Sequence, residues 1–318
     1  MMKTKVENFK NFIFPLMCLT LAIMMVACSS SKETIEDDDG KVKVTTTIGM
    51  IKDAAQNIGG DHVSVTGLMG SGVDPHLYKA SQGDIKKLEQ ADIVFYNGLH
   101  LEGKMIEIFE QIANKKPTYA VSSAISTTDL LAGDKEMQTE FDPHIWFNVK
   151  HWMKATEVIR DALIENDPDH ASDYEKNAKA YLKELELLDN EVTDKIASIP
   201  EKGRVLVTAH DAFGYFGDAY HIKVMGLQGM STASEAGTKD LIDLRDYLIE
   251  NEINAVFIES SIPRKAIDAV IQGAKEKGHD IQIGGELFSD AMGEEGTPEG
   301  TYIGMVRHNV NTIVDALK

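Results

Sequence analysis

Short apolar runs rich in β-branched residues alternate with amphipathic stretches along most of the chain. Each run has the length of a strand, and helical spacing of apolar residues separates the runs, as in 83–89 and 239–250. This alternation is typical of α/β proteins. The predicted strands are Val42–Thr47, Val63–Gly67, Ile93–Tyr96, Thr118–Val121, Val205–Thr208, Ile222–Met225, Ala255–Ile258 and Ile281–Gly284.

The segment Ala171–Ile199 predicts one long helix, because it contains neither proline nor glycine and keeps its apolar residues on one face. The sequence Asp-Pro-Asp at 167–169 supplies a start signal, and Pro200 with Gly203 supplies a stop. Such a helix would be roughly 40 Å long, enough to run along two lobes. Two shorter helices that break near Asn190 are the alternative.

The two halves of the chain resemble each other, since 65–70 (Val-Thr-Gly-Leu-Met-Gly) matches 224–229 (Val-Met-Gly-Leu-Gln-Gly). A polar loop follows each copy and contains His76 in the first and Glu235 in the second. Chance similarity between two βα units is the alternative. A real repeat predicts two similar βα lobes, an N-terminal lobe at 42–168 and a C-terminal lobe at 201–318. The linker helix 169–200 would join them, with a ligand cleft between the lobes.

The N-terminus has the pattern of a lipoprotein signal peptide covering residues 1–27. Three lysines precede an apolar run, 12–27, which is shorter than the ~20 residues of a membrane-spanning helix. The run ends in Met-Val-Ala-Cys, which predicts a lipid on Cys28 and a flexible tether at 28–41. An ordinary signal peptide followed by an incidental cysteine is the alternative.

The chain of 318 residues is acidic, with 51 Asp and Glu against 32 Lys and Arg. This balance argues against nucleic-acid binding, because neutralising phosphates requires clustered basic residues. Removal of residues 1–27 would take away Cys18 and leave a lipidated Cys28. We therefore expect neither a free thiol nor a disulfide in the mature protein.

Three histidines and one aspartate stand in positions suited to metal binding. His76 and His144 each complete an Asp-Pro-His triplet, in which proline stiffens the loop that presents the imidazole. His210 and Asp290 follow predicted strands, where open α/β sheets bind ligands. Two such residues from each lobe would form an N₃O site that suits Zn²⁺ and tolerates Mn²⁺. Taken singly, each histidine is more often an ordinary surface or core residue, so the four residues alone leave the question open.

Six longer motifs resemble, in the same order, those of the zinc/manganese-binding family of ABC-transporter solute-binding lipoproteins. They are Gly72–Tyr78, Tyr96–Glu102, Asp142–Trp146, Thr208–Phe216, Phe257–Ser261 and Leu287–Asp290. The resemblance covers about residues 42–318 and implies a two-lobed fold bridged by one rigid helix. It also implies one Zn²⁺ or Mn²⁺ ion per chain, held in the cleft by His76, His144, His210 and Asp290.

The same resemblance implies a monomer without enzymatic activity that is lipid-anchored in the periplasm or at the outer face of the cell envelope. It would deliver its ion to an ABC import permease, and its partners would be that permease and the ATPase of the permease. The choice of metal stays open. Manganese-selective relatives often carry Glu in place of His210, whereas many zinc-selective relatives have a histidine-rich loop where 125–141 has no histidine.

His100 and Glu235 are further candidates, as residues that contact the ligands rather than the ion. The alternatives are a surface histidine and a carboxylate at a helix start. Two other classes of protein also remain. An exported metallohydrolase needs three ligands, an open position for water and a nearby base, but the chain offers four ligands and no HExxH motif. No motif argues for or against a surface adhesin with a structural metal.

Overall fold

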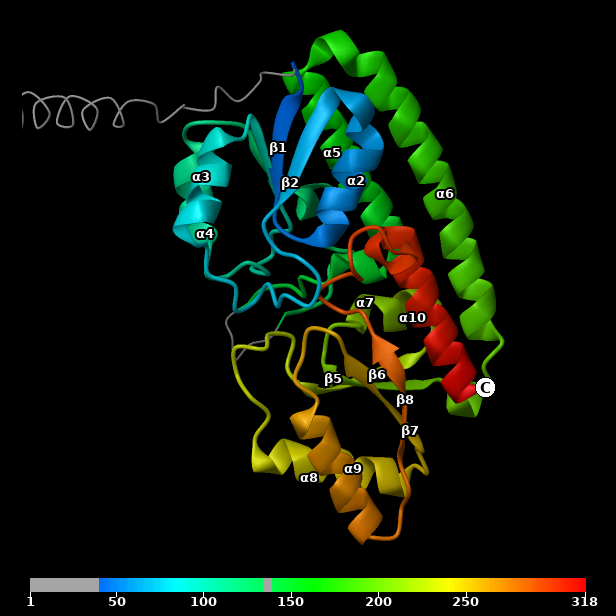
Figure 1. Ribbon diagram of the computed structural model, residues 1–318. Coiled ribbons are helices and arrows are strands. Elements are labelled where there is room, and N and C mark those ends of the chain that lie inside the picture. The colour runs from blue at the N-terminus through cyan, green and yellow to red at the C-terminus, as the bar shows by residue number, and fades with distance from the viewer. Residues whose placement is uncertain (1–39, 134–138) are drawn as a thin grey trace, which may run out of the picture. The chain divides into compact units, whose positions relative to one another are not determined.

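A parallel four-stranded sheet forms the first half of the fold in the computed structural model, which describes residues 40–133 and 139–318 (Figure 1). Its strands lie in the order β2 (Val63–Gly67), β1 (Val42–Thr46), β3 (Ile93–Tyr96) and β4 (Thr118–Ala120). The connecting helices are α2 (Gly49–Gly59), α3 (Gln82–Gln90) and α4 (Ile106–Ala113). The predicted signal peptide, Cys28 and nearly all of the tether lie outside the described residues.

The second half has a similar arrangement, built from two pairs of parallel strands. β5 (Val205–His210) pairs in parallel with β6 (Lys223–Gln228), and β7 (Ala255–Glu259) pairs in parallel with β8 (Gln282–Leu287). These are two separate two-stranded sheets, but β5 lies in contact with β7, so the order β6-β5-β7-β8 resembles β2-β1-β3-β4. The helices of this half are α7 (Gly214–Tyr220), α8 (Thr238–Glu250) and α9 (Lys265–Glu276). The predicted α/β fold is therefore confirmed, with a strand at each of the eight predicted positions.

The four strands of the second half run further than their apolar patterns, and two of them, β5 and β8, lead to predicted site residues. The strand predicted at 205–208 continues to His210, which is therefore the last residue of β5 rather than a residue beyond it. The strand predicted at 281–284 continues to Leu287. In both strands the backbone pairing with the neighbour persists after the run of branched apolar residues has ended.

One uninterrupted helix, α6 (Ala171–Ala197), connects the two halves, so the alternative of a break near Asn190 is wrong. It packs against α2, α5 (Val149–Asn166) and the C-terminal helix α10 (Tyr302–Leu317) (Figure 1). Its buried face repeats at intervals of three or four residues, as expected of an amphipathic helix. These buried residues are Tyr174, Ala178, Tyr181, Leu185, Leu188, Val192 and Ile196.

The larger hydrophobic core is continuous between the halves. It extends from β1 through α2, α5 and α6 to α7 and α10, while a smaller core lies among α8, α9 and the strands β5 to β7. Trp152 of α5 stacks on Tyr302 of α10, with ring centroids 5.0 Å apart. The buried carboxylate of Asp53 in α2 accepts hydrogen bonds from the Tyr181 hydroxyl at 3.0 Å and from the backbone N–H of Tyr302 at 3.2 Å. The last helix of the chain is thus fastened to the first half of the fold.

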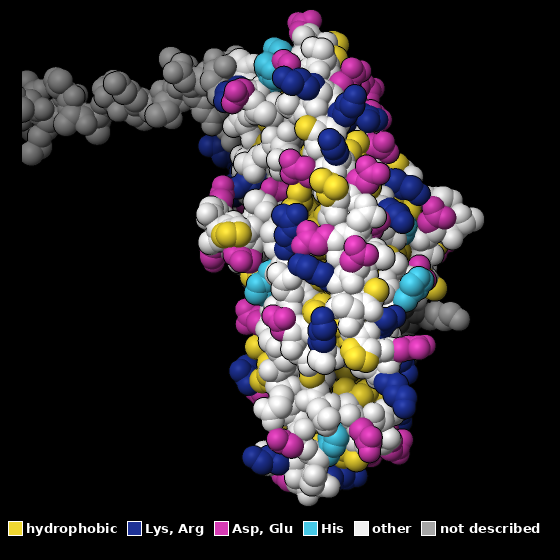
Figure 2. All heavy atoms as spheres, turned by 90° about the vertical axis from the view of Figure 1, so that its right-hand side faces the viewer, with side chains coloured by type: hydrophobic (Ala, Val, Ile, Leu, Met, Phe, Trp, Pro, Cys, Tyr) yellow, Lys and Arg dark blue, Asp and Glu magenta, His cyan; other side chains and the backbone are white. Residues whose placement is uncertain are grey.

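Charged side chains of both signs are interspersed over the face of the molecule that carries α6, with small hydrophobic areas between them (Figure 2). A mixed surface of this kind is ordinary for a water-exposed helix and marks no site by itself. Among residues 40–133 and 139–318, no helix is both long and apolar enough to span a bilayer.

Candidate metal centre

In both Asp-Pro-His triplets the aspartate as well as the proline restricts the backbone conformation. The backbone N–H of His76 donates to Oδ1 of Asp74 at 2.8 Å, and that of His144 donates to Oδ1 of Asp142 at 2.9 Å. An aspartate that binds the backbone two residues ahead forms a tight local turn. The first triplet lies in the loop after β2, and the second lies shortly before α5. Each turn therefore fixes the backbone position from which the histidine side chain extends.

His210 and Asp290 come from the second half. The backbone N–H of His210, at the end of β5, donates to Oε1 of Glu259 at the end of β7, at 2.9 Å. Asp290 follows β8, and the preceding carbonyl of Ser289 accepts a hydrogen bond from Nε1 of Trp146 at 3.0 Å. The ends of parallel strands therefore place these two side chains opposite the two triplets, as the rule for open sheets predicts.

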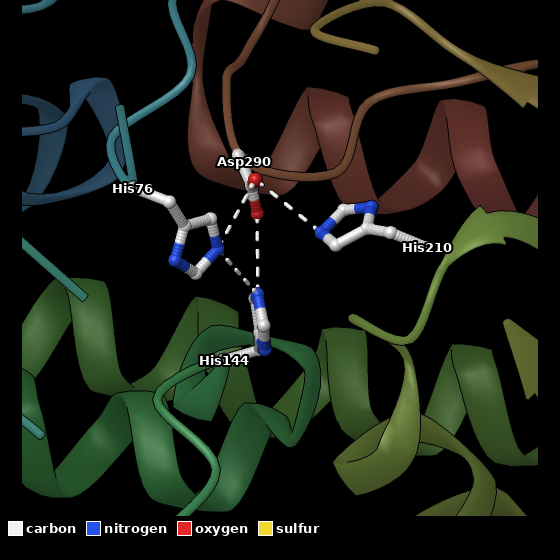
Figure 3. Close-up of side chains that lie close together, drawn as sticks. All are labelled: His76, His144, His210 and Asp290. Carbon is white, nitrogen blue, oxygen red and sulfur yellow. Dashed lines mark hydrogen bonds and ion pairs between the residues drawn. The ribbon is translucent and has the colours of Figure 1, made fainter. Parts of the chain in front are cut away.

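The structure brings all four predicted ligands together (Figure 3). One nitrogen from each of the three histidines and a carboxylate oxygen of Asp290 lie within 4.8 Å of one another, and all four side chains are buried. Nε2 of His76 lies 3.3 Å from Nε2 of His144 and 3.5 Å from Oδ2 of Asp290. Oδ1 of Asp290 lies 3.4 Å from Nε2 of His144, and Oδ2 lies 3.3 Å from Nε2 of His210.

These separations fit a metal ion better than a hydrogen-bond network. Nε2 of His210 and both carboxylate oxygens of Asp290 are buried without a hydrogen-bond partner among the described residues, although they lie close to one another. A tetrahedral ion with bonds of about 2.0–2.1 Å spaces its ligand atoms roughly 3.3–3.4 Å apart. Four of the distances among these atoms, at 3.3–3.5 Å, are close to that spacing, and the set of four ligand atoms lies within 4.8 Å. Buried polar atoms that point at one another without bonding are what an ion between them would satisfy.

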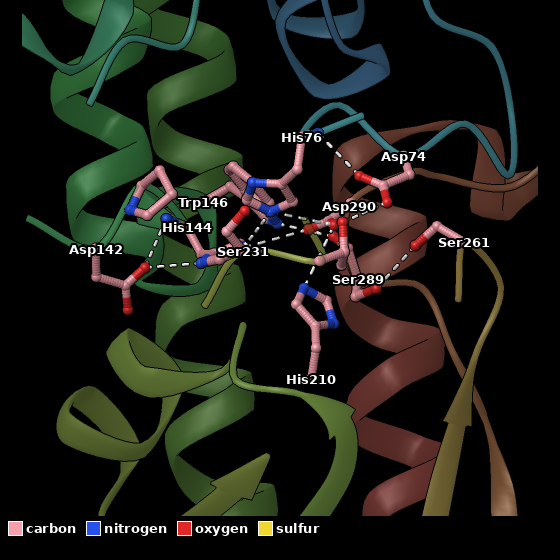
Figure 4. A network of polar contacts seen from close by, with 12 residues as sticks. Asp74, His76, Asp142, His144, Trp146, His210, Ser231, Ser261, Ser289 and Asp290 are labelled. Atoms are coloured by element: carbon pink, nitrogen blue, oxygen red, sulfur yellow. Dashed lines mark hydrogen bonds and ion pairs between the residues drawn. The ribbon is translucent and has the colours of Figure 1, made fainter. Parts of the chain in front are cut away.

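Carboxylates behind two of the imidazoles set their orientation. Figure 4 shows one of them, Asp142, beside His144. Nδ1 of His144 lies 2.7 Å from Oδ1 of Asp142, and Nδ1 of His210 lies 2.5 Å from Oε2 of Glu259. Such a contact keeps the proton on Nδ1, leaves Nε2 as the ligand atom and increases its basicity. The two carboxylates also supply negative charge around a divalent ion.

The pKa values of the ion-free site reflect these contacts. Burial lowers the pKa of His76 to about 3. Burial also opposes protonation of His144, but Asp142 and then Asp290 outweigh it and raise the pKa to about 9. Likewise, Glu259 and Asp290 hold the pKa of His210 well above its usual range in spite of its burial. Although burial acts to raise the pKa of Asp290, His210 and the other imidazoles hold it well below its ordinary value. Without an ion, the neighbouring carboxylates therefore favour the protonated forms of His144 and His210.

His100 and Glu235 lie outside this cluster. His100 is exposed, has a positive φ of 64° and lines a pocket together with His76. Glu235 is exposed in the loop between β6 and α8. The carboxylate at the start of α8 belongs to Asp240, which accepts a hydrogen bond from the backbone N–H of Gly237 at 2.8 Å. The alternative assignment of Glu235 as the helix-start carboxylate is therefore wrong.

Three acidic residues of the site received no role from the sequence. Asp74 and Asp142 stand in the triplets, and the signal that identifies them is an aspartate two residues before a histidine. Glu259 ends a strand, so the rule that selected His210 and Asp290 selects it as well. Its partner is 49 residues away, however, and is known only when β5 and β7 are placed side by side.

Comparisons with known proteins agree with the geometry. The family described as "Zinc-uptake complex component A periplasmic" matches residues 44–316. The manganese-binding lipoprotein MntA of Bacillus subtilis is 56% identical over 281 residues, which are 88% of this chain and 91% of that protein. The zinc-binding protein TroA of Treponema pallidum is 49% identical over 279 residues, 88% of this chain and 90% of that protein.

Among solved structures, the periplasmic zinc-binding protein TroA from Treponema pallidum superimposes with a TM-score of 0.85 at 49% identity. The superposition covers 87% of this chain and 99% of that chain. The family match spans residues 44–316, and the relatives are matched over nearly their whole length. This chain therefore belongs to the zinc/manganese-binding family of ABC-transporter solute-binding proteins, as its motifs predict.

Proposed function

We propose that this protein captures a Zn²⁺ or Mn²⁺ ion outside the cytoplasm and delivers it to an ABC import permease. The observation that carries the proposal is the convergence of four buried ligand atoms, within 4.8 Å of one another, from loops of both halves of the fold. The similar proteins are named as binders of manganese or of zinc, in agreement with this set of donors. No comparison supports a metallohydrolase or an adhesin.

We assign the ion to Nε2 of His76, His144 and His210 and to the carboxylate of Asp290. Oδ1 of Asp290 faces His144, while Oδ2 faces His76 and His210. Binding through one oxygen gives four ligands, which Zn²⁺ prefers, whereas binding through both adds an oxygen, which suits Mn²⁺. A carboxylate placed between the three imidazoles can therefore serve either ion. This accounts for relatives of similar sequence that carry different metals in their names.

Calorimetric titration with each metal tests the assignment, and competition between the two ions gives the preference. We expect one ion per chain. Asp290→Ala should weaken the binding of both metals strongly, because it removes the anionic ligand and leaves three buried imidazoles around a dication. His100→Ala is the control and should keep the stoichiometry. Full binding by Asp290→Ala, or a lost site in His100→Ala, would mean that the ion is held by other residues.

We also propose that the protein carries a lipid on Cys28, that it is a monomer, and that an ATPase drives the permease. The apolar run that ends in small residues before Cys28 supports the anchor. Some of the similar proteins, MntA of Bacillus subtilis among them, are named as lipoproteins, which supports the same inference. Cys28→Ala should move the protein from the membrane fraction to the soluble fraction of cells. An unchanged distribution would rule out this anchor.

A further inference from the structure

The two sides of the metal centre join the halves of the fold in different ways. On one side, Nε1 of Trp146 donates to the carbonyl of Ser289 at 3.0 Å, and the carbonyl of Trp146 accepts from the Tyr302 hydroxyl at 2.7 Å. The Tyr215 hydroxyl donates to the carbonyl of Asp142 at 2.9 Å. These groups are buried in the larger core. Separation on this side would expose aromatic surface at a high free-energy cost.

On the other side, a hydrogen bond between two loops spans the halves. The hydroxyl of Thr232, in the loop between β6 and α8, donates to Oδ2 of Asp74 at 2.5 Å. The other oxygen of Asp74, Oδ1, accepts from the backbone N–H of His76. Thr232 is 8% exposed, although the three residues after it, 233–235, are exposed. One hydroxyl thus ties a surface loop to the turn that positions a ligand.

A pocket of about 140 Å³ opens beside this contact. His76 forms part of its wall, together with His100, Met230, Ser231 and Ala233. The pocket reaches a ligand of the site from the surface, and part of its wall belongs to the loop that Thr232 holds. A second pocket between α2 and residues 292–300 has none of the four ligands in its wall.

We propose that the ion enters and leaves through the pocket beside His76, and that the hydrogen bond from Thr232 to Asp74 is a latch that slows its release. This inference rests on the proposed function. Breaking the bond frees the loop after β6 from the turn that carries His76 and leaves the buried side of the centre closed. The latch is broken and remade once for each ion that passes, and the larger core stays intact.

The release rate of Zn²⁺ tests the latch. Zn²⁺-loaded protein is mixed with an excess of a chromogenic chelator, and the rate is followed in a stopped-flow instrument. Thr232→Val keeps the shape of the side chain and removes the donor, so release should accelerate on the order of tenfold, the effect of losing one charge-assisted hydrogen bond. Thr232→Ser keeps the donor and should restore the slow release.

Thr193→Val is the matched control, because it removes a threonine hydroxyl that bonds only within α6, to the carbonyl of Asp189 at 2.8 Å. Its release rate should equal that of the unmodified protein. If Thr232→Val binds one ion and releases it at the original rate, the latch is wrong while the proposed function stands. If the unmodified protein binds no ion, the proposed function itself fails.

The route is tested by two bulky substitutions at exposed positions. Ala233→Trp fills the pocket beside His76 and should slow both association and release severalfold, with little change in the dissociation constant. Ser71→Trp is the comparison, since Ser71 lines the second pocket, and it should leave both rates unchanged. Slower exchange in Ser71→Trp combined with normal exchange in Ala233→Trp would overturn the route.

Discussion

Glu259 holds His210 twice, through the backbone N–H and through Nδ1, from a strand that is distant in sequence. Its side chain is fully buried, so its charge acts on the imidazole with little screening by water. Asp142 holds His144 through the same two atoms. Two of the three imidazoles are therefore oriented and made more basic by a negative charge that does not face the ion.

Glu259→Gln should lower metal affinity about 10- to 100-fold, because the amide removes the charge and can offer one acceptor where the carboxylate offers two. Titration calorimetry measures the loss, and the stoichiometry should stay at one ion. Glu286→Gln, at an exposed position of β8, is the control and should bind as the original protein does. Unchanged affinity in Glu259→Gln would show that the charge behind His210 is unimportant.

The proposed ligands could be singled out as candidates from local patterns, while their supports could be predicted only in part. His76 and His144 follow an Asp-Pro pair, and His210 and Asp290 stand at or after strand ends. These short stretches leave the metal site open, and the six longer motifs that resemble the family imply the full set. The role of Glu259 depends on which side chain faces it from a neighbouring strand, and no local pattern contains that information. Thr232 is likewise an ordinary loop threonine until the fold brings Asp74 next to it.

At the scale of elements, the close approach of β5 and β6 depends on a glycine. A Cβ on Gly226 would lie 2.4 Å from the backbone nitrogen of Asp211 and 2.6 Å from the carbonyl carbon of His210. Both atoms belong to backbone, which cannot rotate away as a side chain does. The absence of a side chain at this position of β6 therefore allows the end of β5 to place a ligand.

Gly226→Ala should force the two strands apart, destabilise the fold by about 1–3 kcal/mol and weaken metal binding by displacing His210. Denaturant unfolding and titration measure the two effects. Gly70→Ala is the control, because no atom lies within 4 Å of the Cβ it would add. Normal stability and binding in Gly226→Ala would mean that the strands tolerate a wider spacing.

The elements themselves follow from hydrophobic periodicity, since every predicted strand and the long helix are present. Their ends follow less well, because the pairing of β5 and β8 continues after the apolar runs stop. The packing partners of α10 cannot be predicted from the hydrophobic pattern of α10 alone. An apolar face indicates that a helix packs, but it does not indicate that this helix meets both β8 and α2.

At the scale of the whole molecule, protons compete with the ion. His144, with a pKa of about 9, and His210, with a raised pKa, must each lose a proton to bind metal. Metal affinity should therefore rise with pH up to about 9, by as much as tenfold per unit for each protonated imidazole. His76 is already neutral above a pH of about 3 and adds nothing in this range.

Binding at pH 7 should accordingly release protons. Calorimetry in buffers of different ionisation enthalpy counts them, and a pH series from 5 to 9 gives the slope. Affinity that does not change between pH 7 and 5 would rule out a site dominated by histidines. The stability of the ion-free protein depends on pH in the opposite direction to metal affinity. The raised pKa values stabilise the fold fully below the unfolded value of ~6.5, and this stabilisation is lost as the pH rises toward about 9.

The continuous core predicts how the protein unfolds. Because the larger core includes residues of both halves, the ion-free protein should stay folded and unfold mainly in one cooperative transition. Free metal at a thousandfold excess over Kd should add about 4 kcal/mol. Scanning calorimetry with a chelator and with Zn²⁺ measures both effects. Unfolding by the chelator alone would make the ion structural and would contradict a transport role.

The position of Trp146 next to the metal centre makes its fluorescence a natural reporter of metal binding. Its ring lies edge-on to that of His144, with centroids 5.3 Å apart, and its indole nitrogen holds the residue before Asp290. The chain contains two tryptophans, and the other, Trp152, stacks on Tyr302 in the helical core. We therefore expect the emission of Trp146 to change when an ion binds to Nε2 of His144, which a fluorescence titration with Zn²⁺ measures. Metal binding can then be followed by intrinsic tryptophan fluorescence, without an attached dye.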